Sequence, residues 1–166
     1  MDKEDVIAEI NEAFDGVEQP QEITLHVAQA HDRYIYASNF FFRRLDFIGR
    51  WQDVPREHLR CCENALSYLD EVGMRFYLSA YMVWYLRNYT SPNELHNETV
   101  LSSLNPYLDD ERMSRFHKER FSLFNQAQLQ ACAHFVRFCA EDTTGCTFDA
   151  FAQEIYDSYW RQYDEI

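Results

Sequence analysis

The chain has 166 residues, 46% of them hydrophobic, so it has the length of one ordinary domain and enough apolar side chains for a core. Only 4 Gly and 4 Pro accompany 13 Phe, 11 Tyr and 3 Trp, a balance that excludes a disordered chain and argues against an all-β fold. The formal net charge of −13 opposes binding to nucleic acid or to an anionic membrane, because phosphates require a basic patch.

Helical periodicity begins near the amino terminus. Apolar residues recur at spacings of three and four from Val6 to Phe14, and Gly16 ends this short acidic helix. Thr24 is placed to cap a second helix, in which the same periodicity continues through Ile35. The first quarter of the chain therefore predicts two helices.

Residues 39–51, NFFFRRLDFIGRW, fit either a helix buried on several sides or a turn of strand, and we predict a helix. Asp53 and Pro55 then mark the start of the next helix, because Pro is preorganised for the first helical position. Gly73 is expected to end that helix as a left-handed cap or turn residue. The inward stripe of this helix is predicted to consist of Leu59, Cys62, Leu66 and Leu69.

Residues 74–89, MRFYLSAYMVWYLRNY, are apolar on almost every side of a helix. A membrane span needs about 20 consecutive apolar residues. Arg75 and Arg87 bracket only 11 positions, so we predict no membrane span. A helix without a polar face is normally central and buried, and its tyrosine hydroxyls should bond to backbone or polar groups. An aromatic ligand groove is the alternative.

Capping signals mark the helices of the second half. Residues 91–94, SPNE, have the composition of a capping box, and Asn125 to Gln128 repeats it. The acidic run Asp109 to Glu111 can begin a helix that carries Arg120 on its outer face, and Thr147 is expected to cap the last helix.

These elements predict an all-α fold, a single-domain bundle of about seven helices around the central aromatic-rich helix. No internal repeat or long linker divides residues 1–166, so we expect one domain. The amino terminus has no basic segment followed by an apolar one, which favours a cytoplasmic protein.

The commoner catalytic signatures, GxGxxG, the P-loop, HExxH and GxSxG, do not occur. We therefore predict no catalytic residue and no cofactor. His58, Cys61 and Cys62 place three possible metal ligands on one helix, and His26 with Asp32 lies near another. Neither group supplies a complete tetrahedral set with a second ligand pair at close spacing, so no metal site is predicted. The five cysteines form no CxxC pair, which favours reduced thiols, and Cys132 and Cys139 are expected to fill the core.

One polar cluster is a candidate site. Arg75 begins the core helix, and it could meet Asp53 if the two helices form an antiparallel hairpin. In a structural role, which we favour, Arg75 would pair with a carboxylate or with the unpaired carbonyls at the end of a helix. In a functional role it would bind an anion. The full candidate cluster consists of Trp51, Asp53, Arg56, Arg75, Tyr77 and Tyr81.

Three motifs resemble a family of small uncharacterised bacterial proteins, a domain of unknown function. They are WQDVP at residues 51–55, LDEVGMRFYLSAYM at 69–82 and FSLFNQAQ at 121–128, and the match covers about half the chain. The sequence departs from the family pattern at Ser79, where Pro is common, and at Phe124, where Leu is common. The resemblance implies a helical bacterial protein and brings no assigned activity.

The excess negative charge lies at the two ends. Residues 1–22 carry eight acids and one base, and residues 141–166 carry seven acids and one base. Solubility alone is the simplest explanation, but the pattern also predicts a non-enzymatic, immunity- or inhibitor-like protein whose acidic terminal helices bind a basic protein partner. One alternative is a small-molecule binder or enzyme with a pocket near Arg75, Tyr77 and Tyr81. Another is a homodimer that buries aromatic residues of 40–47 or of the last helix.

Overall fold

The computed structural model describes residues 1–36, 39–91 and 97–164, and all regular structure in these ranges is helical. The all-α prediction is confirmed, although the helices are shorter and more numerous than about seven. The α-helices are α1 (Lys3–Ala13), α2 (Leu25–Asp32), α3 (Asn39–Arg43), α4 (Arg56–Cys61), α5 (Glu71–Asn88), α6 (Asn97–Ser103), α7 (Glu111–Arg120), α8 (Gln126–Glu141), α9 (Asp149–Ile155) and α10 (Arg161–Asp164). Short 3₁₀ turns η1 (Trp51–Asp53) and η2 (Ala65–Ser67) flank α4, and a π segment, η3 (Tyr156–Trp160), joins α9 to α10.

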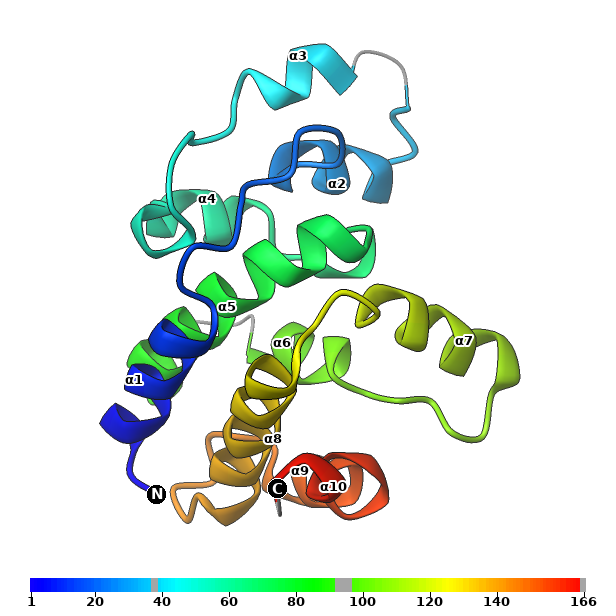
Figure 1. The fold of residues 1–166 in the computed structure, drawn as a ribbon. Helices are drawn as coiled ribbons and strands as arrows, with labels where there is room; N and C mark the ends of the chain where they lie inside the picture. The colour runs from blue at the N-terminus through cyan, green and yellow to red at the C-terminus, as the bar shows by residue number, and fades with distance from the viewer. Residues whose placement is uncertain (37–38, 92–96, 165–166) are drawn as a thin grey trace.

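Helix α5 is the central helix that the apolar stretch predicted. Figure 1 shows it in the middle of the molecule, with α2, α3 and α4 toward one end and α8 to α10 toward the other. Thirteen of its 18 residues are buried. The same hydrophobic core includes Ile10 of α1, Leu101 of α6 and Phe135 of α8. Among the described residues, no helix has both the length and the apolar content that crossing a membrane requires.

Gly73 lies inside the first turn of α5, so the prediction that it ends the preceding helix is wrong. Asp70 caps α5 instead, and its carboxylate accepts the Gly73 N–H at 2.8 Å. A Cβ at Gly73 would lie 2.8 Å from Leu69 Cδ2 and 3.0 Å from the Ile23 carbonyl oxygen. Close packing of neighbouring segments therefore explains the glycine better than a left-handed backbone does.

The segment between α2 and α4 is less helical than predicted. Helix α2 ends at Asp32, and Tyr34 has a left-handed backbone with φ of 58°. Phe40 and Phe41 of the short helix α3 are 67% and 57% exposed, so the expected helix buried on several sides is not formed. Consecutive aromatic residues point in different directions around a helix, so one packing face cannot bury all of them. Residue Ser38 lies outside the described ranges.

Helix α4 begins after Pro55, close to the predicted start, but it ends at Cys61. The chain then makes the turn η2 before α5 begins. All four residues of the predicted inward stripe are nevertheless buried: Leu59, Cys62, Leu66 and Leu69. The apolar spacing thus predicted which side chains face the core but not the break in the helix.

Capping predictions in the second half are largely confirmed. Asp110 caps α7 by accepting the Met113 N–H, and Asn125 with Gln128 forms the capping box of α8. The helix start predicted at 91–94 falls mainly on residues outside the described ranges. Cys132 and Cys139 are fully buried in α8, as expected.

Two predictions in this half are wrong. Arg120 is buried rather than outside, because its guanidinium donates to the Leu66 carbonyl and contacts the Met74 sulfur at 2.8 Å. Burial lowers the pKa of Arg120 to about 10. Thr147 does not cap the last helix: its hydroxyl donates to the Cys139 carbonyl at 2.7 Å, and Phe148 occupies the cap position.

Candidate functional site

The predicted polar cluster divides into separate contacts. Trp51 is buried, and its indole Nε1 donates to the Phe14 carbonyl at 2.8 Å. Asp53 accepts from Arg50 at 2.9 and 3.2 Å. Asp53 therefore forms a local ion pair on η1, and it is not the partner of Arg75.

Arg75 joins three helices through a glutamine. Its Nε donates to Gln128 Oε1 at 3.1 Å, and Gln128 Nε2 donates to the Ala13 carbonyl at 3.1 Å. These bonds connect α5 to α8 and to the end of α1. Asp15 and Glu18 line the same surface cleft as Arg75. Arg75 thus bonds to a glutamine side chain that itself bonds to the end of α1, and not to a carboxylate.

The two tyrosines of the cluster face the core. Tyr81 donates its hydroxyl to the Cys62 carbonyl at 2.6 Å, with the Leu59 carbonyl 3.2 Å away. The Tyr77 hydroxyl lies 3.5 Å from Gln19 Nε2, and burial raises the pKa of Tyr77 to about 12. Neither tyrosine lines the cleft beside Arg75. The pocket near Arg75, Tyr77 and Tyr81 is therefore not formed by these three residues together.

Trp51 and Arg56 instead line a different pocket, of about 380 Å³, between α1, α4 and α5. Arg87 and Trp84 form part of the opposite wall. Trp84 is 5% exposed, and its indole N–H is buried without a hydrogen-bond partner. Pockets of this size accommodate small ligands. The remaining wall consists of Asn11, Gln52, Val54, Leu59, Ala80, Val83 and Asn88.

The two acid-rich ends of the chain meet on helix α8. Helices α1 and α10 both pack against α8. His134 of α8 lies between them, with Nδ1 2.6 Å from Glu9 Oε2 and Nε2 2.8 Å from Asp164 Oδ1. Asp164 also pairs with Arg137 at 3.3 Å and accepts from Tyr156, and these partners hold the pKa of Asp164 below its ordinary value. The side chains at this junction are thus tightly paired.

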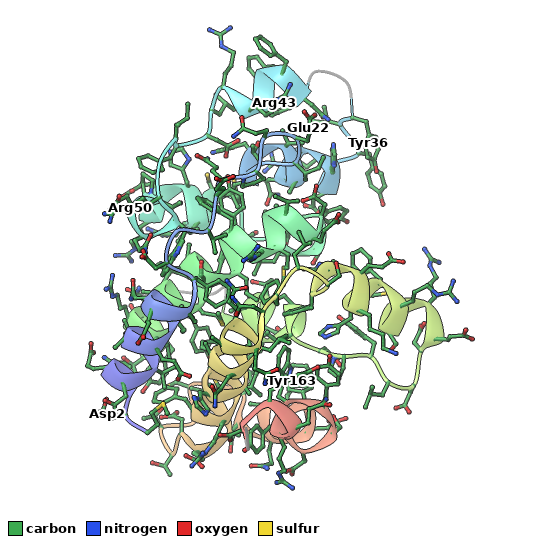
Figure 2. All side chains as sticks on the ribbon, in the orientation of Figure 1. Asp2, Glu22, Tyr36, Arg43, Arg50 and Tyr163 are labelled. Atoms are coloured by element: carbon green, nitrogen blue, oxygen red, sulfur yellow. The ribbon has the colours of Figure 1, made fainter. Side chains whose placement is uncertain are left out.

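An apolar surface lies at the other end of the molecule, around α3. Ile48 is 87% exposed, and the other exposed members of this α3 patch are Tyr34, Ile35, Tyr36, Phe40, Phe41 and Leu45. In Figure 2, Tyr36 and Arg43 mark this end, whereas Asp2 and Tyr163 lie toward the end where the acidic helices meet.

The match to known proteins is at the level of the family. A family model, described as a family of unknown function (DUF6714), matches residues 2–164. The chain belongs to DUF6714. This agrees with the domain of unknown function that the sequence motifs resemble. No curated protein and no solved structure matches this DUF6714 chain.

Several polar residues of this DUF6714 protein had no sequence signal that singled them out. His134 lies 125 residues from Glu9, and Trp84 belongs to a stretch that the apolar pattern assigns to the core. The fold brings His26 and Asp46 beside His58, Cys61 and Cys62. The spacing of the last three residues suits metal ligands, but the sequence shows no further ligand pair next to them. The His58–Cys62 spacing and the nearby pair of His26 and Asp32 were the sequence signals that pointed toward this cluster.

Proposed function

We propose that this DUF6714 protein is a non-enzymatic interaction protein, immunity- or inhibitor-like, whose acid-rich ends bind a basic protein partner. The observation that carries the proposal is the packing of α1 and α10 on the same helix, with His134 between Glu9 and Asp164. Two acidic segments that are distant in sequence thereby contribute to one region. We further propose that residues 1–166 act as one domain in the bacterial cytoplasm.

Electrostatics supports a basic partner. Glu4, Glu12, Asp15 and Glu18 are all exposed on α1 and the turn that follows it. Charges of one sign gathered on a surface accelerate association with a partner of opposite charge. Salt at 0.1 M screens this attraction between exposed charges that are more than about 10 Å apart. The expected complex is therefore salt-sensitive. The same charges oppose nucleic acid as the partner.

The test requires acids that do not stabilise the fold. Asp2 and Asp5 form the capping box of α1, and Glu9 binds His134, so these three must remain. The test variant combines Glu4→Gln, Glu12→Gln, Asp15→Asn and Glu18→Gln. A matched control removes the same number of exposed acids elsewhere, by Glu57→Gln, Glu71→Gln, Asp109→Asn and Glu119→Gln.

Affinity capture from the cells that produce the chain, at low and high salt, compares the three proteins. We expect one basic protein to be captured by the wild type and by the control, to be lost from the test variant, and to dissociate as salt rises. The proposal is refuted if no protein behaves in this way, or if both variants lose the same partner equally.

A second candidate function is small-molecule binding in the pocket of Trp51 and Trp84. Arg56 and Arg87 line this pocket together with the two tryptophans, and guanidinium groups favour a small ligand that carries a carboxylate or phosphate. Tryptophan fluorescence titration with a panel of such anions tests this, because two of the three tryptophans line the pocket. We expect quenching that Arg87→Gln weakens, and unchanged fluorescence with every anion would reject the pocket as a ligand site.

A further inference from the structure

Five side chains of metal-ligating types meet beside helix α4. His26 comes from α2, Asp46 from the turn after α3, and His58, Cys61 and Cys62 from α4 and its carboxyl end. The ligand atoms of His26, Cys61 and Cys62 all lie within 4.8 Å of one another. Core filling explains Cys62, which is buried, but it does not explain the exposed Cys61 next to it.

Two of the three distances between these atoms match a tetrahedral site, and the third is at most 4.8 Å. Cys61 Sγ lies 3.7 Å from Cys62 Sγ, and Cys62 Sγ lies 3.6 Å from His26 Nδ1. With Zn–S bonds of about 2.3 Å and Zn–N bonds of about 2.0 Å, tetrahedral geometry requires about 3.8 Å between sulfurs and about 3.5 Å between sulfur and nitrogen. An ion could therefore bind these atoms without a large rearrangement of the backbone.

His58 and Asp46 have the positions of supporting residues. His58 Nδ1 lies 3.0 Å from His26 Nε2, and the two rings are nearly perpendicular at 86°. When His26 Nε2–H donates to His58, His26 Nδ1 carries the free lone pair that faces Cys62. Metal-binding histidines usually donate their second ring N–H in this way, which sets the tautomer. Asp46 Oδ1 accepts the His26 backbone N–H at 3.1 Å, and Asp46 Oδ2 is buried without a hydrogen-bond partner.

Two of the three ligand residues line a pocket. His26 and Cys61 line a cavity of about 240 Å³, together with Arg33. The other wall residues are Gln29, Ala30, Ile35, Phe42 and Leu45. Zinc sites with three protein ligands keep the fourth position for water or a small ligand. An open position beside an arginine suits an anionic ligand.

We propose that the chain binds one soft divalent ion of the Zn²⁺ class through His26 Nδ1, Cys61 Sγ and Cys62 Sγ, with the fourth position open to this pocket. Thiolate ligands favour zinc over magnesium or calcium, which prefer oxygen. The thiols lose their protons on binding, so each bound ion releases protons to solvent. The site is independent of the acidic ends and of the Trp84 pocket.

Titration of the reduced, metal-free full chain with Co²⁺ tests the proposal. We expect one Co²⁺ per chain, with the intense visible bands of a tetrahedral site and a thiolate-to-cobalt charge-transfer band in the near ultraviolet. Added Zn²⁺ should abolish both spectra, and native mass spectrometry should give one Zn²⁺ per chain. Bound Zn²⁺ should also raise the thermal midpoint as its concentration rises.

Variants identify the ligands. Cys61→Ser and His26→Gln should each weaken Co²⁺ binding by about 10-fold or more. Cys61 is exposed and outside the core, so its variant should fold, and circular dichroism checks this. The matched controls Cys146→Ser and His31→Gln change the same residue types elsewhere and should bind as the wild type does.

Three results would overturn the proposal. The first is the absence of a thiolate charge-transfer band. The second is weak octahedral cobalt bands that persist in Cys61→Ser, which would assign any ion to His26, His58 and Asp46 instead. The third is an equal loss of affinity in the control variants.

Discussion

Tyr81 and Tyr85 allow two identical substitutions on α5 to be compared. The Tyr81 hydroxyl bonds to the Cys62 carbonyl at 2.6 Å and lies 3.2 Å from the Leu59 carbonyl, whereas the Tyr85 hydroxyl is buried beside Cys139 without a hydrogen-bond partner. Both side chains are at most 1% exposed. Replacement by Phe removes one oxygen in each case, but only Tyr81→Phe breaks a buried hydrogen bond.

The two substitutions should change the free energy of unfolding by different amounts. Cys62 O still accepts the Ala65 N–H at 3.0 Å after Tyr81→Phe, so mainly the hydroxyl bond and the Leu59 contact are lost. The loss should lower the free energy of unfolding by about 2 kcal/mol. For a chain of this length, that corresponds to a decrease in Tm of about 4–8 °C. Tyr85→Phe removes an unpaired polar atom and should leave the free energy of unfolding unchanged or raise it slightly.

Urea unfolding followed by circular dichroism, together with calorimetry, measures both variants. Because the Tyr81 hydroxyl holds the end of α4, Tyr81→Phe should also weaken cobalt binding at Cys61 and Cys62, and Tyr85→Phe should not. Equal destabilisation by the two substitutions would refute the assignment of these hydrogen bonds.

Three further predictions concern packing, pH and association. Gly73→Ala should lower the free energy of unfolding by about 1–3 kcal/mol in urea denaturation. The reason is that the alanine Cβ would lie 2.8 Å from Leu69 Cδ2 and 3.0 Å from a backbone oxygen. Unchanged stability would contradict this close packing. Burial lowers the pKa of His117 to about 4, below its unfolded value of 6.5, so its contribution to stability is complete above pH 6.5 and is lost as the pH falls toward 4. That loss is at most about 3 kcal/mol. The free energy of unfolding, measured from pH 7 to pH 4.5, should therefore fall less in His117→Gln than in the wild type. An equal fall in both proteins would contradict this assignment to His117. Finally, if a second copy of the chain covers the α3 patch, sedimentation should show a concentration-dependent dimer that Phe40→Ser with Phe41→Ser abolishes, and a monomer at all concentrations would reject the homodimer.

Local sequence patterns determined the secondary-structure class and the identity of the central helix. The stretch from Met74 to Leu86 is apolar in all directions, and such a helix is stable only when other helices surround it. Caps at Asp110 and Asn125 were equally readable, because a side chain there bonds to a backbone N–H three residues later. The motifs that resemble a family of unknown function agreed with the family match.

Tertiary structure alone decided which residues meet. Arg75 and Gln128 are 53 residues apart, and Cys62 and His26 are 36 apart. Periodicity assigns a residue to a face of its helix, but it does not specify the helix that packs on that face. The exposure of Phe40 and the burial of Arg120 were mispredicted for the same reason. The candidate sites of this protein arise from contacts between distant segments, whereas its helices arise from spacings of three and four residues.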